Sequence, residues 1–330
     1  MNTRRIPALS RDTAAIGLGC MGMSWAYNTP ESADPRAAAV VIHGALDRGI
    51  TLLDTSDAYA AGHNEQLVGQ AIAGRRDEAI VATKGGLVSS YVDGKPHLER
   101  NGRPDHLRAA IDASLERLGV DRIDLYYLHR VDRSVPLEES WGALADAEAS
   151  GKVAAIGLSE VTVEQADLAH RLHPVAAVQS ELSLWTRDAL GEGTNSDGAS
   201  SGDVVSWCAD HDAVFVPFSP LGRGFLTGKL DVNTLPDNDF RAGLPRFSGD
   251  SARQNERIVE VVRDVARRHS CSPATIALAW VLAQGEHVIP IPGTTKLGRL
   301  DENLAAAAID LTEQDLQSLD NLPAATGSRY

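Results

Sequence analysis

Short apolar runs alternate with helix-patterned segments along most of this chain of 330 residues, and this alternation limits the possible folds more than any other feature. About eight of the runs have strand length, which is commonly about five residues. They lie at residues 14–18, 50–54, 80–84, 125–129, 154–158, 176–179, 214–218 and 288–291. Helical patterns lie between them, including residues 35–48, 104–118, 137–150 and 162–172. Strands that alternate with helices predict a parallel sheet, and about eight such units predict an α/β fold closed into a (β/α)8 TIM barrel.

The length fits a single domain over residues 1–330, because a barrel commonly takes about 250 residues and more with insertions. Residues 6–11 are predicted to form an N-terminal hairpin that floors the barrel, and a C-terminal helix is predicted to end the fold. Residues 186–202 are rich in Gly and Ser and read as an inserted flexible loop. Residues 223–251 contain several Gly and Pro residues and predict a second, mobile loop.

Composition argues against several classes of protein. Hydrophobic residues make up 43% of the chain, and no apolar run approaches the roughly 20 residues of a membrane span. A net charge of −14 disfavours nucleic acid or another polyanion as a partner. Residues 1–10 lack the apolar stretch of a secretory signal, so a cytoplasmic protein is expected.

The cysteines and histidines predict neither a disulfide framework nor a metal site. Cys20, Cys208 and Cys271 are far apart and odd in number, which favours reduced thiols. His170 and His173 are three residues apart, but no further ligand motif accompanies them, so a solvated helix face is the better interpretation.

Polar residues follow three of the apolar runs. Asp54, Lys84 and His129 each end a run, and Tyr59 lies on the loop after Asp54. The carboxyl ends of barrel strands share one face, where barrel enzymes carry out chemistry. An ammonium at Lys84 would favour the phenolate of Tyr59 and lower its pKa, and Asp54 could keep that buried ammonium charged. His129 could orient a carbonyl oxygen, so these four residues predict a proton-transfer site that needs a hydride from a cofactor.

Each of the four residues taken singly also has a structural interpretation. An Asp after a strand is often a cap or turn residue, and a Tyr, Lys or His there is often a rim residue with a satisfied hydrogen bond. The occurrence of all four together favours function.

The segment from residue 49 to 65, GITLLDTSDAYAAGHNE, followed by Gly69, resembles a signature of the aldo-keto reductases. The resemblance covers nearly the whole chain. It implies that Tyr59 is the general acid, Lys84 its pKa-lowering partner, Asp54 the counter-ion of the lysine and His129 the group that orients the carbonyl. It also implies the floor hairpin, and a role for residues 223–251 in folding over the cofactor pyrophosphate.

Residues at later strand ends predict the nicotinamide site. Ser159 and Gln179 end two runs and could hydrogen-bond the carboxamide, with Asp54 beside them. Phe218 ends the next run and could stack on the nicotinamide ring, although core packing is an equal alternative for an aromatic there. A turn that could approach phosphate follows, made of Ser219, Pro220, Leu221, Gly222 and Arg223. All these positions match the cofactor site of the family.

The last predicted strand leads into a segment that resembles the phosphate-reading part of the family. Lys296 and Arg299, with threonine hydroxyls and a helix N-terminus, could hold a 2′-phosphate, so NADPH is expected in preference to NADH. A capped surface helix with solvated charges is the alternative. The remaining positions that the resemblance assigns to the cofactor here are Gly293, Thr295, Glu302 and Asn303.

Gly17, Gly19 and Gly22 spell a GxGxxG motif after the first run, which raises the alternative of a Rossmann site. That motif requires the last glycine to open a helix, whereas residues 23–30 have the composition of a loop. The glycines are instead expected to let the backbone approach a ligand. Gly19 and Met21 are accordingly assigned to the cofactor site.

Aromatic residues on the loops predict the lining of the substrate pocket. Trp25, Tyr27 and Trp185 could line an aromatic mouth suited to small carbonyl compounds. Many relatives carry Asn after Ser159, whereas this chain has Glu160, which could accept the carboxamide N–H but not donate to it.

The predicted function is that of an NADP-dependent aldo-keto reductase of the alcohol dehydrogenase type, which reduces aldehydes or ketones with hydride from NADPH. A nicotinamide-binding regulatory subunit with slow turnover is the alternative, since the resemblance extends to such members of the family.

Overall fold

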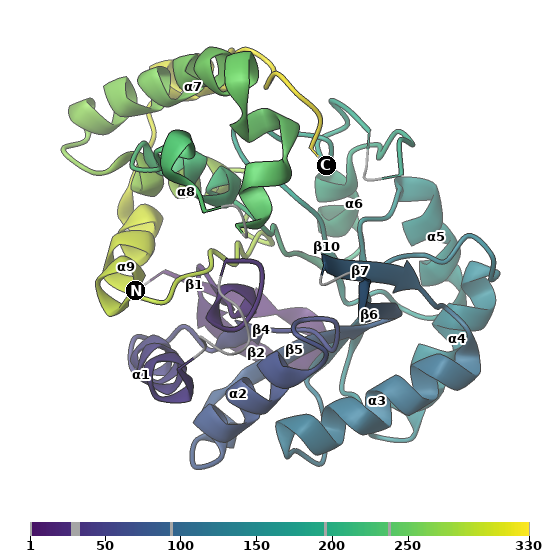
Figure 1. The fold of residues 1–330 in the computed structure, drawn as a ribbon. Helices are drawn as coiled ribbons and strands as arrows, with labels where there is room; N and C mark the ends of the chain where they lie inside the picture. Colours follow the sequence, from purple (N-terminus) through teal and green to yellow (C-terminus); the bar gives the residue numbers. More distant parts are fainter. Residues whose placement is uncertain (1, 28–33, 93–94, 195–196, 237–238, 330) are drawn as a thin grey trace.

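A computed structural model describes residues 2–27, 34–92, 95–194, 197–236 and 239–329 of the chain. Its centre is a parallel seven-stranded sheet with the order β11-β10-β9-β8-β5-β4-β3. The strands of this sheet are β3 (Leu18–Gly19), β4 (Leu52–Asp54), β5 (Ile80–Gly85), β8 (Leu125–Leu128), β9 (Ile156–Ser159), β10 (Ala177–Gln179) and β11 (Val214–Phe215). Figure 1 shows these strands inside a ring of helices.

Residues 288–293 close the sheet into a barrel. They form parallel bridges from Val288 to Phe215 on one side and from Gly293 to Gly19 on the other. The N–H of Ile289 donates to Phe215 O at 2.9 Å, while Pro290 O accepts from Gly17 N at 2.8 Å. Prolines alternate in this segment and lack an N–H, so the ladder is irregular although the chain occupies a strand position. The prediction of a (β/α)8 barrel is confirmed.

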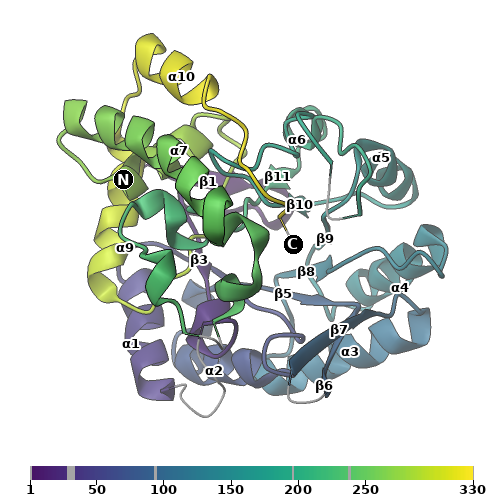
Figure 2. The ribbon, with the colours of Figure 1, turned by 45° about the horizontal axis from the view of Figure 1, so that its top comes forward.

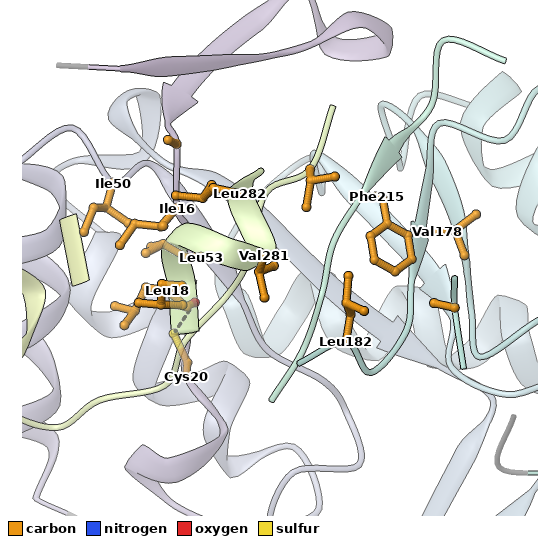
Figure 3. Close-up of a cluster of buried hydrophobic side chains, with 14 of the residues drawn as sticks. Ile16, Leu18, Cys20, Ile50, Leu53, Val178, Leu182, Phe215, Val281 and Leu282 are labelled. Carbon is orange, nitrogen blue, oxygen red and sulfur yellow. Dashed lines mark hydrogen bonds between the residues drawn. The ribbon is translucent and has the colours of Figure 1, made fainter. Parts of the chain in front are cut away.

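The barrel interior is filled with apolar side chains. Leu52, Ile80, Leu125 and Ile289 are among the buried residues of the inner cluster. Alternate strand residues point outwards instead and pack against the helices. Figure 3 shows part of this outer layer, where Phe215 and Val178 from the sheet and Val281 and Leu282 from α8 lie in one cluster, together with Ile16, Leu18, Leu53 and Leu182.

The amino-terminal hairpin closes the floor of the barrel. Strands β1 (Thr3–Ile6) and β2 (Arg11–Ala14) pair antiparallel, joined by a 3₁₀ turn over Pro7–Leu9. Ile6 belongs to the inner cluster, and Leu9 packs against it. The hairpin is therefore longer than predicted. Ala14 belongs to it, and the first barrel strand is only Leu18–Gly19, shorter than the predicted run at residues 14–18.

Several of the helices start at recognisable sequence signals. Pro occupies the first turn of α1, α3 and α8, where its missing N–H has no helical partner in any case. Capping boxes start α5, at Thr162 and Gln165, and α10, at Thr312 and Asp315. The helix bounds are α1 (Pro35–Leu46), α2 (His63–Ile72), α3 (Pro104–Leu118), α4 (Leu137–Ala149), α5 (Val163–Leu172), α6 (Val204–Asp210), α7 (Gly249–Arg268), α8 (Pro273–Leu282), α9 (Leu297–Leu304) and α10 (Glu313–Asp320).

The structure adds elements that the sequence patterns did not predict. Between β5 and α3, strands β6 (Leu87–Val92) and β7 (Lys95–Arg100) form an antiparallel pair outside the barrel. Short 3₁₀ turns occupy much of the predicted mobile loop, at Gly222–Thr227, Val232–Thr234, Phe240–Gly243 and Pro245–Phe247. No helix in the described ranges is long and apolar enough to cross a membrane.

Candidate active site

Lys84 is the centre of the polar cluster at the carboxyl ends of the strands. Its side chain is only 1% exposed, yet each of its three possible donor bonds is made. The Nζ donates to Asp54 Oδ1 at 2.6 Å, to Thr55 O at 2.8 Å and to Tyr59 Oη at 3.3 Å. Asp54 in turn accepts from Gln179 Nε2 through Oδ2 at 2.8 Å. The structure thus brings Asp54, Tyr59 and Lys84 into direct contact.

The charges and the burial of this cluster favour a protonated Lys84 and a protonated Tyr59. Burial works against the Lys84 ammonium, but Asp54 and Tyr59 outweigh it, and the pKa of Lys84 is raised. For Tyr59, burial is the largest influence and raises the pKa, while Lys84 lowers it and Asp54 raises it further. The net direction of the Tyr59 pKa is upward. Tyr59 is therefore a neutral phenol with a proton to donate.

His129 stands at the edge of the Tyr59 ring. The two ring centroids are 6.1 Å apart with an interplanar angle of 83°. Burial, followed by the nearby charges of Arg130 and Lys84, holds the pKa of His129 well below its ordinary value. Its Nδ1 lies 3.1 Å from Ser56 Oγ. A neutral imidazole with Nδ1 occupied can present Nε2 to a carbonyl oxygen.

The three aromatic residues predicted for the substrate mouth have different surroundings. Trp25 stacks on Tyr59, with centroids 5.5 Å apart, and so reaches the cluster directly. The Tyr27 ring lies under the guanidinium of Arg241, 4.7 Å away. Trp185 is 5% exposed and stacks on Phe225 at 4.8 Å. Its ring thus faces the segment after β11 instead of open solvent.

The residues predicted for the nicotinamide lie on the same face. Ser159 ends β9, Gln179 ends β10, and Ser159 Oγ accepts from Arg130 Nη1 at 3.1 Å. Phe218 is half-buried and packs against the inner cluster of the barrel. Gly19, at the end of β3, approaches the closing segment so tightly that a Cβ would come within 2.8 Å of Ile291 O. A 3₁₀ turn, Met21–Met23, follows it.

The turn after Phe218 contains backbone conformations that few residues adopt. Ser219, Gly222, Arg223 and Gly224 have φ values of 51°, 55°, 56° and 97°. Glycine adopts these φ values without strain, but Ser219 and Arg223 are strained there, and strained non-glycine residues occur often at ligand sites. Between them lie Pro220, which is buried, and Leu221, which is half-buried.

The predicted phosphate segment is exposed at the start of α9. Thr295, Lys296 and Arg299 are exposed, and Lys296 N donates to Thr294 Oγ1 at 3.1 Å. The other predicted positions lie at its two ends. Gly293 borders β3, Glu302 forms an ion pair with Lys229 at 3.6 Å, and Asn303 is buried.

An ion network around Glu160 was not anticipated from the sequence. Glu160 is buried, has a φ of 57° and accepts from Glu181 N at 2.9 Å. Its other oxygen pairs with Arg329, which also pairs with Asp188 at 3.0 Å and Glu181 at 3.3 Å. Burial raises the pKa of Glu160, but Arg130 and Arg329 outweigh it, and the net direction is downward. Both carboxylate oxygens are thus engaged, and no local pattern predicts a partner so distant in sequence.

The two predicted loops are anchored to their surroundings. In residues 186–202, Thr186 is buried, and Asp197 accepts from Arg100 Nη1 of β7 at 2.8 Å. In residues 223–251, Phe240 N donates to Ala26 O at 3.2 Å. The second loop therefore contacts the loop after β3, on which Trp25 lies.

Within the part of the chain that the structure describes, no α-helix opens at the GxGxxG glycines. Gly22 lies within the 3₁₀ turn, and the next described helix, α1, begins at Pro35. Among the described residues no cluster of His, Cys, Asp or Glu could hold a metal ion, and the three cysteines are free thiols.

The fold and the cluster define a class: barrel proteins with a buried Lys–Asp pair, a phenol and a neutral imidazole at the carboxyl ends of the strands. Residues 15–324 match the family model described as Aldo/keto reductase family. The chain belongs to this family of oxidoreductases.

Individual relatives agree with this assignment. The chain is 43% identical over 309 residues to "Probable aldo-keto reductase 1" of Glycine max, covering 93% of this chain and 85% of that protein. A solved glycerol dehydrogenase from Gluconobacter oxydans is 30% identical, with a TM-score of 0.84 and coverage of 97% and 94%. An aldo-keto reductase from Klebsiella pneumoniae, solved with NADP and acetate, is 23% identical with a TM-score of 0.70 and coverage of 100% and 98%, a likeness of fold.

Proposed function

We propose that the protein reduces aldehydes or ketones to alcohols with NADPH, with Tyr59 as the general acid. One observation carries the proposal: a single buried ammonium, Lys84 Nζ, contacts both Asp54 Oδ1 at 2.6 Å and Tyr59 Oη at 3.3 Å. Stability of the fold does not require a buried ion pair beside a neutral phenol, because apolar residues of similar volume stabilise a core at least as well. It suits the donation of a proton to an alkoxide.

Three of the residues divide the work of proton delivery. Tyr59 Oη gives its proton to the developing alkoxide oxygen. The Lys84 ammonium, held by Asp54, stabilises the phenolate left behind. This requires no group other than those already in contact.

His129 orients the substrate. The neutral ring lies at the edge of Tyr59, and its Nε2 would donate to the carbonyl oxygen while Tyr59 protonates it. Trp25, stacked on Tyr59, would shield this position. The substrate class is therefore a small carbonyl compound.

The chemistry of the strand-end residues fits a nicotinamide dinucleotide. Ser159 and Gln179 offer a hydroxyl and an amide to a carboxamide, and Phe218 offers a ring face beside the left-handed turn. The exposed Lys296 and Arg299 at the start of α9 suit a 2′-phosphate, which favours NADPH over NADH. The bound cofactor would supply the hydride that the side chains of the site cannot.

The test is oxidation of NADPH by the wild type and by Tyr59→Phe, with aromatic and aliphatic aldehydes, dicarbonyls and glyceraldehyde as substrates. Glyceraldehyde is included because of the relative that is a glycerol dehydrogenase. The variant should lose about 10²-fold or more of kcat, the usual contribution of a general acid, while the Kd for NADPH changes little. Wild-type turnover by the variant would overturn the assignment of Tyr59. Tight NADPH binding with no turnover of any substrate would instead favour a regulatory subunit.

A further inference from the structure

Ser56 connects His129 to a second acid. Its side chain is fully buried, and its Oγ lies 3.1 Å from His129 Nδ1 and 3.2 Å from Asp57 Oδ1. The same oxygen accepts from Ala58 N at 3.1 Å. A hydroxyl has one proton to donate. The imidazole nitrogen and the Asp57 carboxyl therefore compete for it.

This competition has a consequence for the histidine. Neutral His129 carries one N–H, and the partner of Nδ1 determines which nitrogen bears it. If Ser56 donates to Nδ1, the proton is on Nε2, where it can be donated to a carbonyl oxygen. If the Ser56 hydroxyl turns to Asp57, Nδ1 carries the proton and donates to Ser56 Oγ. Nε2 is then a bare acceptor, which repels a carbonyl oxygen.

We propose that Ser56 is a positioning residue that sets the tautomer of His129, and that Asp57 reverses this setting when it ionises. The role of the tautomer in reduction rests on the proposed function, but the tautomer itself is a property of the protein alone. Ser56 and Asp57 lie in the segment between Asp54 and Tyr59, and neither donates the proton to the substrate.

The surroundings of Asp57 place its ionisation in a useful range. Burial, and then the carboxylate of Glu65 on α2, raise its pKa to about 8, against the opposing influence of Arg117 on α3, the Ser56 hydroxyl and the Ala58 N–H. Tyr126 of β8 also faces this carboxyl. At neutral pH Asp57 is thus largely a neutral acid and need not attract the hydroxyl proton.

Lys84 and Arg130 are the charged groups that face His129, and both disfavour a second proton on its ring. The ring therefore stays neutral throughout the change. As the pH rises, Asp57 releases one proton to solvent and Ser56 keeps its own while turning towards the carboxylate. His129 exchanges its Nε2 proton for one on Nδ1 through solvent.

The direct test is ¹⁵N NMR of protein labelled on histidine, with the His129 signals assigned by comparison with His129→Gln. Protonated and unprotonated ring nitrogens differ strongly in ¹⁵N shift, so the spectrum reports the tautomer without any turnover. Wild type should carry the proton on Nε2 at low pH and on Nδ1 at high pH, with a midpoint near 8. Asp57→Asn should keep it on Nε2 throughout, because the amide does not ionise.

Asp77→Asn is the matched control. It makes the same chemical change at an exposed aspartate and should leave the midpoint in place. Two results would overturn the proposal: a proton on Nδ1 at neutral pH in the wild type, or a transition that persists in Asp57→Asn. A second variant, Ser56→Ala, removes the hydroxyl itself. If that variant does not fold, Asp57→Asn alone decides the question.

A kinetic measurement then tests the functional consequence. Ser56→Ala should lower kcat for reduction about tenfold, the loss expected for one neutral hydrogen bond, with little change in the Kd for NADPH. If the wild type shows a pH-dependent tautomer but no turnover, the proposed function is wrong and the control of the tautomer by Ser56 and Asp57 is supported. If the wild type turns over substrate but its tautomer does not change with pH, the proposed function is supported and the control of the tautomer is wrong.

Discussion

Lys84 forms a buried ion pair with Asp54, so its substitution should affect both the stability of the fold and the proposed proton transfer. Both side chains are nearly fully buried, so solvent has little access to replace a lost partner of the ammonium. A buried ion pair adds little stability relative to apolar residues, but removing one partner leaves the other charge uncompensated. Removing one charge of this pair should therefore destabilise the fold more than removing both.

Lys84→Met should destabilise the fold by about 3–5 kcal/mol, because it leaves Asp54 buried without its counter-ion. Lys84→Met combined with Asp54→Asn removes both charges and should recover much of that loss, since Gln179 can still hydrogen-bond an amide oxygen at position 54. Urea unfolding measures the free energy, and NADPH oxidation measures activity. Both variants should lack turnover, so recovery of activity in the double variant would contradict the role of the lysine.

Helix α10 illustrates an element whose start depends on one carboxylate. Asp315 Oδ2 accepts from Thr312 N at 3.0 Å and Thr312 Oγ1 at 2.7 Å. Its oxygens also meet Arg268 Nη2 at 2.6 Å and His269 Nε2 at 2.8 Å at the end of α7. These bonds outweigh burial and hold the Asp315 pKa below its ordinary value. The capping box thus also docks α10 onto α7.

Asp315→Asn should cost about 1–2 kcal/mol of unfolding free energy at neutral pH, through loss of the cap and of the charge-assisted bonds. Because the folded-state pKa is depressed, the stabilisation by Asp315 is complete above its unfolded-state pKa of about 4 and is lost as the pH falls below that. The difference between wild type and variant should therefore shrink in acid. Chemical denaturation at a series of pH values measures it, and a difference that grew on acidification would contradict this account.

Element boundaries were predictable where a local signal exists. The predicted helix at residues 104–118 has the observed bounds of α3, with Pro104 in the first turn and Gly119 in a left-handed conformation at its end. The β6–β7 pair was missed although the sequence places Asp-Gly at positions 93 and 94 between two strand-like runs, a hairpin signal. The closing segment at residues 288–293 carries alternating prolines, so its pairing depends on the barrel and not on propensity.

At the scale of the whole molecule, the final segment of the described chain returns to the barrel face. Figure 2 shows the chain after α10 running back to end beside β9 and β10. Arg329 lies there with 9% of its surface exposed and pairs with Glu160, Glu181 and Asp188. The strand-end positions of the site were predictable from apolar runs and a family resemblance. The contact between Arg329 and Glu160 was not predictable, because these residues are 169 positions apart and no local pattern connects them.

Arg329→Met should lower stability by about 3–5 kcal/mol, because it leaves buried carboxylates without a full counter-charge. It should also weaken NADPH binding, since Glu160 follows Ser159, which is proposed to hold the carboxamide, and has a strained backbone. Arg253→Met is the matched control: Arg253 is 74% exposed and forms a surface pair with Asp250, so its loss should cost about 1 kcal/mol or less. Denaturant unfolding and NADPH titration by fluorescence measure the two effects. If both variants lost equal stability, the Arg329 network would contribute no more than a surface ion pair. If Arg329→Met lost stability but kept its NADPH affinity, the network would not influence the cofactor site.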